Sequence, residues 1–123
     1  MADILIVDDS AAFRQTLKKI VLWRFPSMQI LEAKEGKEAI EKTRKELPKL
    51  IFMDVRLPGE NGFQLTRKIK AAHPEIPVII ITSYDSPEYS ETAYDAGADF
   101  FLSKKSSSAA DILKKVESIL TPN

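Results

Sequence analysis

The chain has 123 residues, with 18 basic and 18 acidic side chains, one histidine and no cysteine. This length fits one domain, and the lack of cysteine excludes a disulfide framework, a thiolate metal site and a thiol nucleophile. The formal net charge of zero argues against direct binding of nucleic acid or of an anionic membrane surface. No apolar run approaches the roughly 18 residues of a membrane-spanning helix, so we expect one soluble, cytoplasmic domain over residues 1–123.

Short apolar runs alternate along the chain with segments of helical periodicity. The runs are typical of strands buried on both faces of a sheet, except that residues 28–33 are mixed and indicate an edge strand. In chain order, the expected strands are 4–7, 28–33, 50–53, 78–81 and 100–102. Five helices are expected between and after these strands. The first begins after Ser10, the second covers residues 37–47, and the third runs from Asn61 to Ala72. The fourth runs from Ser86 to about Ala96, and the fifth begins after Ser108. We expect Trp23, at the end of the first helix, to pack locally.

Capping and turn residues support these boundaries. Ser108 and Asp111 indicate a capping box. Ser86 is an N-cap residue, and Pro87 follows it at the first position of the helix. Pro58 and Gly59 occupy the positions that a type II turn favours. Because strands and helices alternate five times, the pattern predicts a parallel sheet with helices on both faces and right-handed crossovers.

Polar side chains follow four of the expected strands, at the edge where an open α/β sheet binds its ligands. Asp8 and Asp9 follow the first strand, Asp54 the third, Thr82 the fourth and Lys104 the fifth. Each of them taken alone is typical of a turn, a helix cap or a solvated lysine. Together the three carboxylates repel one another and need a cation, for which Mg²⁺ with its preference for oxygen ligands is suited.

Four segments of the sequence together resemble the receiver domain of bacterial two-component response regulators. They are Val-Asp-Asp-Ser at 7–10, Met-Asp-Val-Arg-Leu-Pro-Gly-Glu-Asn-Gly at 53–62, Ile-Thr-Ser at 81–83 and Gly-Ala-Asp-Phe-Phe-Leu-Ser-Lys at 97–104. The resemblance covers essentially the whole chain. It implies a flavodoxin-like (βα)5 doubly wound α/β fold with a five-stranded parallel sheet in the order 2-1-3-4-5. It also implies a phosphoacceptor signalling domain rather than an enzyme.

In this family the aspartate that ends the third strand accepts a phosphoryl group from a phosphohistidine, so the resemblance implies that role for Asp54. The donor would be a sensor histidine kinase or a histidine phosphotransfer protein. The resemblance further implies that Asp9, Asp54 and the backbone carbonyl of Arg56 bind Mg²⁺ or Mn²⁺, with Asp8 acting through water. Carboxylate nucleophiles that form acyl phosphates are an established covalent route.

The resemblance assigns the remaining site residues to contact with the phosphoryl group and to a switch. Thr82 and Lys104 would contact phosphoryl oxygens, and the Ser83 N–H would donate to them. Phe101 would then turn inward as Thr82 moves. The surface formed by the fourth helix, fifth strand and fifth helix would then change its affinity for a partner. That partner would be an output domain or target, or a second copy of the chain in a phosphorylation-dependent homodimer.

Three positions depart from the usual family pattern. Lys105 stands where a proline joined by a cis bond is common, and since a cis bond before a non-proline residue costs about 2.5–4 kcal/mol, we expect a trans bond or a locally strained loop. Phe101 lacks the hydroxyl of the more familiar tyrosine. Arg56 and Tyr84 are bulky residues at the expected mouth of the site, and we expect them to impede the water that hydrolyses the acyl phosphate.

Other functional classes fit less well. A haloacid-dehalogenase-type phosphatase needs a second aspartate two residues after the nucleophile, where this chain has Arg56. A flavodoxin-like FMN protein needs a phosphate-binding loop after the first strand, where Asp8 and Asp9 would repel a phosphate. A degenerate receiver that acts only as an interaction module remains an alternative. From the length we expect the receiver to take up almost all of these residues, with no effector domain among them, and both a stand-alone regulator and the N-terminal part of a DNA-binding transcriptional regulator remain open.

Overall fold

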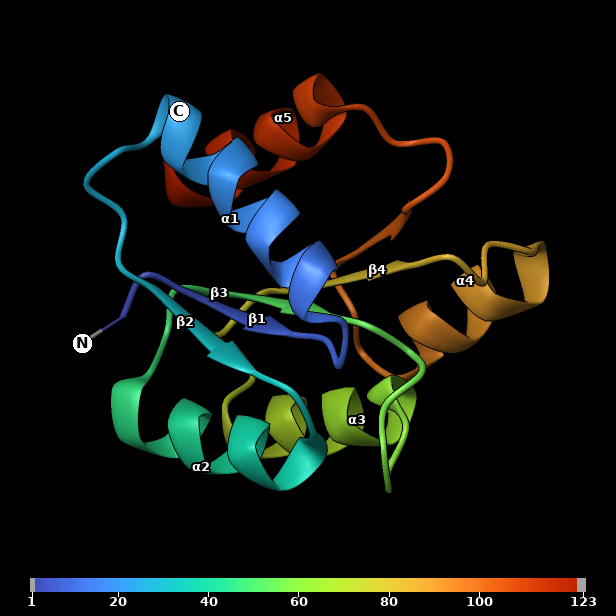
Figure 1. Ribbon diagram of the computed structural model, residues 1–123. Helices are drawn as coiled ribbons and strands as arrows, with labels where there is room; N and C mark the ends of the chain where they lie inside the picture. The colour runs from blue at the N-terminus through green and yellow to red at the C-terminus, as the bar shows by residue number, and fades with distance from the viewer. Residues whose placement is uncertain (1, 122–123) are drawn as a thin grey trace.

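Five strands alternate with five helices in the computed structural model, which describes residues 2–121 (Figure 1). The strands are β1 (Ile4–Val7), β2 (Ile30–Ala33), β3 (Leu50–Met53), β4 (Val78–Thr82) and β5 (Phe100–Ser103). The helices are α1 (Ala11–Arg24), α2 (Gly36–Glu46), α3 (Gly62–Ala72), α4 (Pro87–Asp95) and α5 (Ala109–Leu120). The expected domain limits include residues 1, 122 and 123, which lie outside the described residues.

The strands form one parallel sheet in the order β2-β1-β3-β4-β5, which confirms the predicted fold class and strand order. Helices α1 and α5 cover one face, and α2, α3 and α4 cover the other (Figure 1). Side chains alternate between the two faces along each strand. Ile4 and Ile6 therefore pack against the α1/α5 layer, whereas Leu5 and Val7 pack against the opposite layer.

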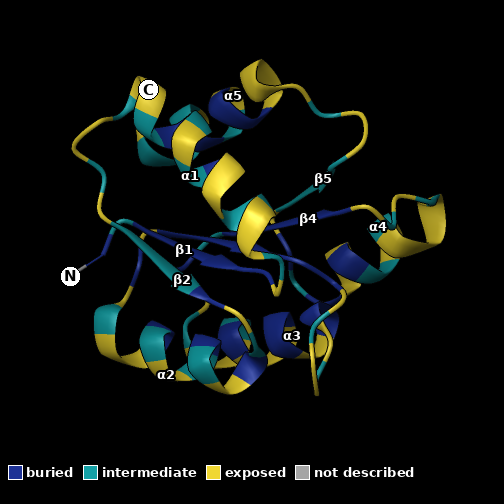
Figure 2. Cartoon of the chain, in the orientation of Figure 1, coloured by how far each residue is buried: buried dark blue, intermediate teal, exposed yellow. Residues whose placement is uncertain are grey.

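The central strands are apolar, apart from Thr82 at the end of β4, because both of their faces are covered by helices. Every residue of β1, β3 and β4 is buried, whereas most residues of β2 and all residues of β5 are partly exposed at the edges of the sheet (Figure 2). Within residues 2–121, no helix combines the length and the apolar character needed to cross a membrane.

Several element boundaries differ slightly from the sequence expectation. β2 begins at Ile30 and not at residue 28, because the Met28 N–H donates to the Phe25 carbonyl in a turn (3.1 Å). α2 begins one residue earlier than expected, since the Glu35 side chain caps it by accepting from the Glu38 N–H (2.7 Å). The expectation that Trp23 packs locally was wrong, because this residue is 80% exposed.

The capping and turn signals that shape the loops are largely confirmed. The predicted capping box forms at the start of α5 from Ser108, and a second capping box, which was not predicted, forms at the start of α3 from Asn61. Ser86 is the N-cap of α4, but its side chain makes no capping hydrogen bond. Gly59 has a φ of 79°, the value that the third position of a type II turn requires.

Candidate functional site

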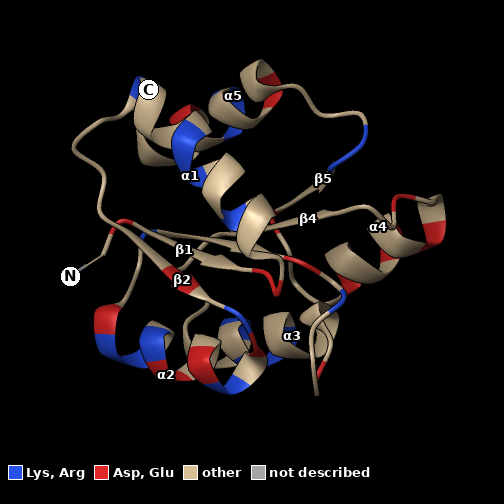
Figure 3. Cartoon of the chain, viewed as in Figure 1, with Lys and Arg blue, Asp and Glu red and all other residues tan. Residues whose placement is uncertain are grey.

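The site lies at the carboxyl edge of the sheet, where the ends of β1 and β3 are adjacent. Val7 pairs with Met53, and the Asp54 N–H donates to the Val7 carbonyl (2.9 Å), so the two strands end at the same level. Figure 3 shows acidic residues just beyond both strands. One carboxylate oxygen from each of Asp8, Asp9 and Asp54 lies within 4.8 Å of the other two. The parallel register thus brings together the three carboxylates that the sequence predicted to converge.

This acidic cluster has the donor set and the spacing that a hard divalent cation needs. Mg²⁺ prefers oxygen ligands such as carboxylates and binds them at about 2.0–2.1 Å, and the three carboxylate oxygens lie within 4.8 Å of one another. Asp8 is buried, whereas Asp9 is exposed and its side chain is free to adjust to an ion. The residues present therefore fit a magnesium-type site.

Lys104 supplies the positive charge next to these carboxylates. Its ammonium donates to Asp8 Oδ2 at 2.7 Å and to Asp54 Oδ2 at 3.2 Å, and it lies 4.1 Å from the centroid of the Phe13 ring. Burial alone would lower the pKa of Lys104, but the hydrogen bond to Asp8 and the charge of Asp54 raise it above its ordinary value. Lys104 is therefore a permanent cation at neutral pH.

Asp8 and Asp54 are buried carboxylates with different partners. Burial raises the pKa of Asp8, an effect that its hydrogen bond with Lys104 offsets only in part. Asp8 Oδ1 accepts the Ser10 N–H (2.9 Å), and Asp54 Oδ1 accepts the Val55 N–H (2.7 Å). Both side chains are thus held by backbone amides on one oxygen and by lysine on the other.

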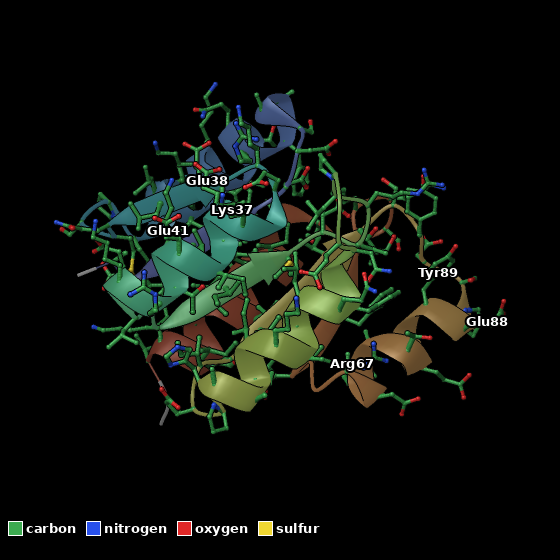
Figure 4. All side chains as sticks on the ribbon, turned by 90° about the horizontal axis from the view of Figure 1, so that it is seen from below. Lys37, Glu38, Glu41, Arg67, Glu88 and Tyr89 are labelled. Carbon is green, nitrogen blue, oxygen red and sulfur yellow. The ribbon has the colours of Figure 1, made fainter. Side chains whose placement is uncertain are left out.

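The β4–α4 segment forms the second wall of the site. Thr82 is buried at the end of β4, and its hydroxyl oxygen accepts the Tyr84 N–H (3.3 Å), while Ser83 is exposed. The Arg56 guanidinium lies 4.7 Å from the centroid of the Tyr84 ring. The centroid of the Tyr84 ring lies 5.7 Å from that of Tyr89, a residue in the first turn of α4 that is labelled in Figure 4. Arg56 and Tyr84 are therefore neighbours, as their positions after β3 and β4 suggested.

The turn after Lys104 is held by a side-chain hydroxyl. There is no cis peptide bond among the described residues, so the trans bond predicted before Lys105 is confirmed. Ser103 Oγ accepts the N–H groups of Lys105 (3.1 Å) and Ser106 (3.2 Å) and donates to Asp85 Oδ2 (2.6 Å). These bonds define the turn without a proline and join it to the β4–α4 segment.

Phe101 is half-buried and packs on the core cluster of the α2/α3/α4 layer, beside Ile80 of β4. Its position is therefore that of a core residue next to the strand that ends in Thr82, and the switch role expected for it stays a prediction.

Three residues that shape the site were not predicted from the sequence: Phe13, Arg14 and Ser103. Phe13 lies within the first helix, where nothing in the sequence pattern marks it as a site residue, and its ring lies under Lys104. Arg14 donates to the carbonyl of Asp8 (2.7 Å), a contact that no local sequence pattern predicts. Only Ser103 carried a usable signal, because a serine before a turn is a common acceptor for the following amides.

Comparisons with known proteins agree with this geometry. The sequence model of the response regulator receiver domain matches residues 4–117. The chain is 33% identical over 117 residues to the transcriptional activator protein ExaE of Pseudomonas putida, covering 95% of this chain and 54% of that protein. It is 30% identical over 101 residues to the response regulator MprA of Mycolicibacterium vanbaalenii, covering 82% and 43% of the two chains. This chain thus spans about half the length of these curated relatives.

A solved structure supports the same assignment. The CheY-like response regulator receiver domain protein of Methanospirillum hungatei aligns with a TM-score of 0.87 and 30% identity, covering 98% of this chain and 94% of that chain. The fold, the acidic edge with its lysine and the sequence match agree, and this chain belongs to the response regulator receiver domain family of two-component signalling systems.

Proposed function

We propose that this chain accepts a phosphoryl group on Asp54 in a reaction that depends on Mg²⁺ or Mn²⁺. The donor is the phosphohistidine of a sensor histidine kinase or of a histidine phosphotransfer protein. The observation that carries the proposal is the convergence of Asp8, Asp9 and Asp54 within 4.8 Å of one another, with the ammonium of Lys104 bonded to Asp8 and Asp54. Such a cluster supplies both a carboxylate nucleophile and the charge neutralisation on which phosphoryl transfer depends.

Each residue has a distinct part in this reaction. Asp9, Asp54 and the backbone carbonyl of Arg56 hold the cation, with Asp8 acting through water. The bound cation supplies neutralisation of the charge on the phosphoryl oxygens. A carboxylate oxygen of Asp54 forms a bond to phosphorus while the phosphorus–nitrogen bond of the donor breaks, and the imidazole leaves with the bonding electron pair.

Three further residues hold the transferred group. Lys104 pairs with a phosphoryl oxygen, the Thr82 hydroxyl donates to another, and the Ser83 N–H donates from the β4–α4 segment. The acyl phosphate adds negative charge at the position of the Asp54 carboxylate, and the Thr82 side chain moves toward the phosphoryl group. Phe101 then turns inward, which changes the surface formed by α4, β5 and α5.

The altered surface is the output of the domain. Response regulators act with histidine kinases and output domains, and relatives of this chain include a transcriptional activator. We therefore propose that the α4–β5–α5 surface controls an output of this kind from the cytoplasm, or joins two phosphorylated copies in a homodimer. The domain itself remains a signalling module whose own chemistry is limited to phosphotransfer and dephosphorylation.

The decisive experiment measures the mass of the intact chain after incubation with acetyl phosphate. We expect a gain of one phosphoryl group that requires Mg²⁺ and is absent from Asp54→Asn, because the amide is not a nucleophile. Asp99→Asn is a matched control, since Asp99 lies at the other end of β5 and bonds the Val78 N–H. No gain in the parent chain, together with no binding of beryllofluoride, would favour the degenerate receiver instead.

Arg56 and Tyr84 are expected to lengthen the life of the acyl phosphate. Their stacked side chains, 4.7 Å apart, flank the segment that carries Thr82 and restrict the approach of water. In the double variant Arg56→Ala/Tyr84→Ala, we expect dephosphorylation about tenfold faster, equivalent to ~1.4 kcal/mol of activation free energy. The measurement is loss of the phosphorylated mass after removal of acetyl phosphate. Arg67→Ala/Tyr94→Ala, which alters exposed residues of α3 and α4, serves as the control, and an unchanged rate in the first variant would refute this role.

A further inference from the structure

Arg14 is a charged residue of α1 that the proposed reaction does not use. Its Nη1 donates to the backbone carbonyl of Asp8 at 2.7 Å, and its Nε donates to Glu32 Oε1 at 2.8 Å. The side chain is only 15% exposed, so both bonds lie in a partly buried setting. A single guanidinium therefore connects the middle of β2 to the segment that carries the acidic pair.

Glu32 is a firm anchor for this guanidinium. The hydrogen bond from Arg14 lowers the pKa of Glu32 below its ordinary value, so that its carboxylate is charged at neutral pH. Lys18 lies 3.6 Å from Glu32 Oε2, and the Gln15 amide donates to the same carboxylate. Glu32 also belongs to β2, which is paired with β1 at Ile6, two residues before Asp8. Arg14 is thus fixed relative to the sheet before it bonds the Asp8 carbonyl.

The Asp8 carbonyl belongs to the peptide unit that joins Asp8 to Asp9. Asp8 has its own restraints, because Lys104 and the Ser10 N–H bond its two carboxylate oxygens. Asp9 is exposed, and among the bonds found for the described residues none is made by its carboxylate. The orientation of this peptide, which Arg14 restrains, therefore sets the position of the Asp9 backbone and the direction of its Cα–Cβ bond, from which the carboxylate reaches the site.

We propose that Arg14 is a positioning residue for the divalent cation, acting by fixing the peptide that joins Asp8 and Asp9. The inference rests on the proposed function, because it concerns the same cation. Groups that orient metal ligands without touching the metal typically contribute 10–100-fold in metal affinity. Arginine suits this role because its planar fork bonds Glu32 and the Asp8 carbonyl together, whereas a lysine is a flexible point charge.

A competing explanation gives the opposite sign. If Arg14 acted only through its charge, it would repel a cation held by the adjacent carboxylates. Its neutral replacement would then bind the cation more tightly, and its lysine replacement would bind as the parent chain does. A positioning role predicts weaker binding in both replacements.

The test is a titration of the chain with Mn²⁺, in which electron paramagnetic resonance measures the free ion. We expect Arg14→Gln and Arg14→Lys to weaken binding about 10–100-fold. Lys18→Gln is the matched control, because Lys18 contacts Glu32 from the next turn of the same helix, and we expect its affinity to stay within about twofold. Circular dichroism establishes that each variant is folded, and Arg14→Lys alone decides the matter if Arg14→Gln does not fold.

The outcomes separate this inference from the proposed function. Unchanged or tighter binding by both Arg14 variants overturns the positioning role and leaves the cation site intact. An equal loss in Lys18→Gln also overturns it, because the effect would then arise from the charges around Glu32. If the parent chain itself binds no Mn²⁺, the proposed function fails, and the inference fails with it.

Discussion

Replacement of Lys104 by methionine is expected to lower the free energy of unfolding by about 3 kcal/mol when no divalent cation is present. The ammonium of Lys104 is the group that bonds both Asp8 (2.7 Å) and Asp54 (3.2 Å), and both carboxylates are buried. Without Lys104, the neighbouring carboxylates of Asp8 and Asp54 lack their shared cation. One of them must then take up a proton, or the ends of β1 and β3 that carry them must move apart. Chemical denaturation at neutral pH in the presence of a chelator measures the change.

A second variant tests whether the loss arises from the uncompensated carboxylate. In Asp8→Asn/Lys104→Met one of the two buried carboxylates becomes a neutral amide, so Asp8 no longer repels Asp54, and the side-chain oxygen can still accept the Ser10 N–H. We therefore expect part of the lost stability to return. Lys115→Met is the matched control, because Lys115 lies over the Phe100 ring at 4.3 Å much as Lys104 lies over Phe13. We expect this control to cost no more than about 1 kcal/mol. A Lys104→Met chain as stable as the parent would contradict the argument.

Added Mg²⁺ should compensate for the missing lysine. A cation that binds only the folded chain stabilises it by mass action, by about 2.7 kcal/mol at a hundredfold excess over the dissociation constant. We therefore expect a larger Mg²⁺-dependent rise in stability for Lys104→Met than for the parent chain, provided that Asp8, Asp9 and Asp54 form the cation site.

Replacement of Gly62 by alanine is expected to have a comparably large effect on both stability and phosphorylation. A Cβ atom at this first residue of α3 would lie 2.0 Å from the carbonyl oxygen of Asp54 and 3.0 Å from Cα of Val55. Because these are backbone atoms, no side-chain rotation relieves the contact, and the β3–α3 connection must shift. We expect a loss of about 3 kcal/mol in the free energy of unfolding.

The same shift displaces Asp54, the proposed phosphoacceptor. A misplacement of about 1 Å at a reacting group can cost about 100-fold in rate, so we expect the rate of phosphorylation by acetyl phosphate to fall by a similar factor at a temperature where the variant is folded. Gly36→Ala is the control, because its Cβ would meet a side chain, Leu65 Cδ2 at 2.8 Å, and not the backbone of the site. If Gly62→Ala and Gly36→Ala had the same free energy of unfolding and the same rate of phosphorylation, the contact with the Asp54 backbone would not be the cause of either loss.

Local patterns predicted the elements well because they report on features that lie within a few residues of one another. The apolar runs identified β1, β3 and β4, and the side chains of Asn61 and Ser108 marked the starts of α3 and α5. Boundaries shifted where a nearby hydrogen bond competed, as at Met28 and Glu35. The exposure of Trp23 was not predictable, because it depends on whether another element covers the end of α1.

The order of residues along the chain by itself determined the alternation of strands and helices, and with it the edge of the sheet at which Asp8, Asp54 and Lys104 had to emerge. Only the tertiary structure decided how close these groups come and which residues hold them. Lys104 reaches Asp8 from a position 96 residues away. Contacts over such separations depend on strand order, register and rotamer together, because each of these can move a side chain by several ångströms without changing any local pattern.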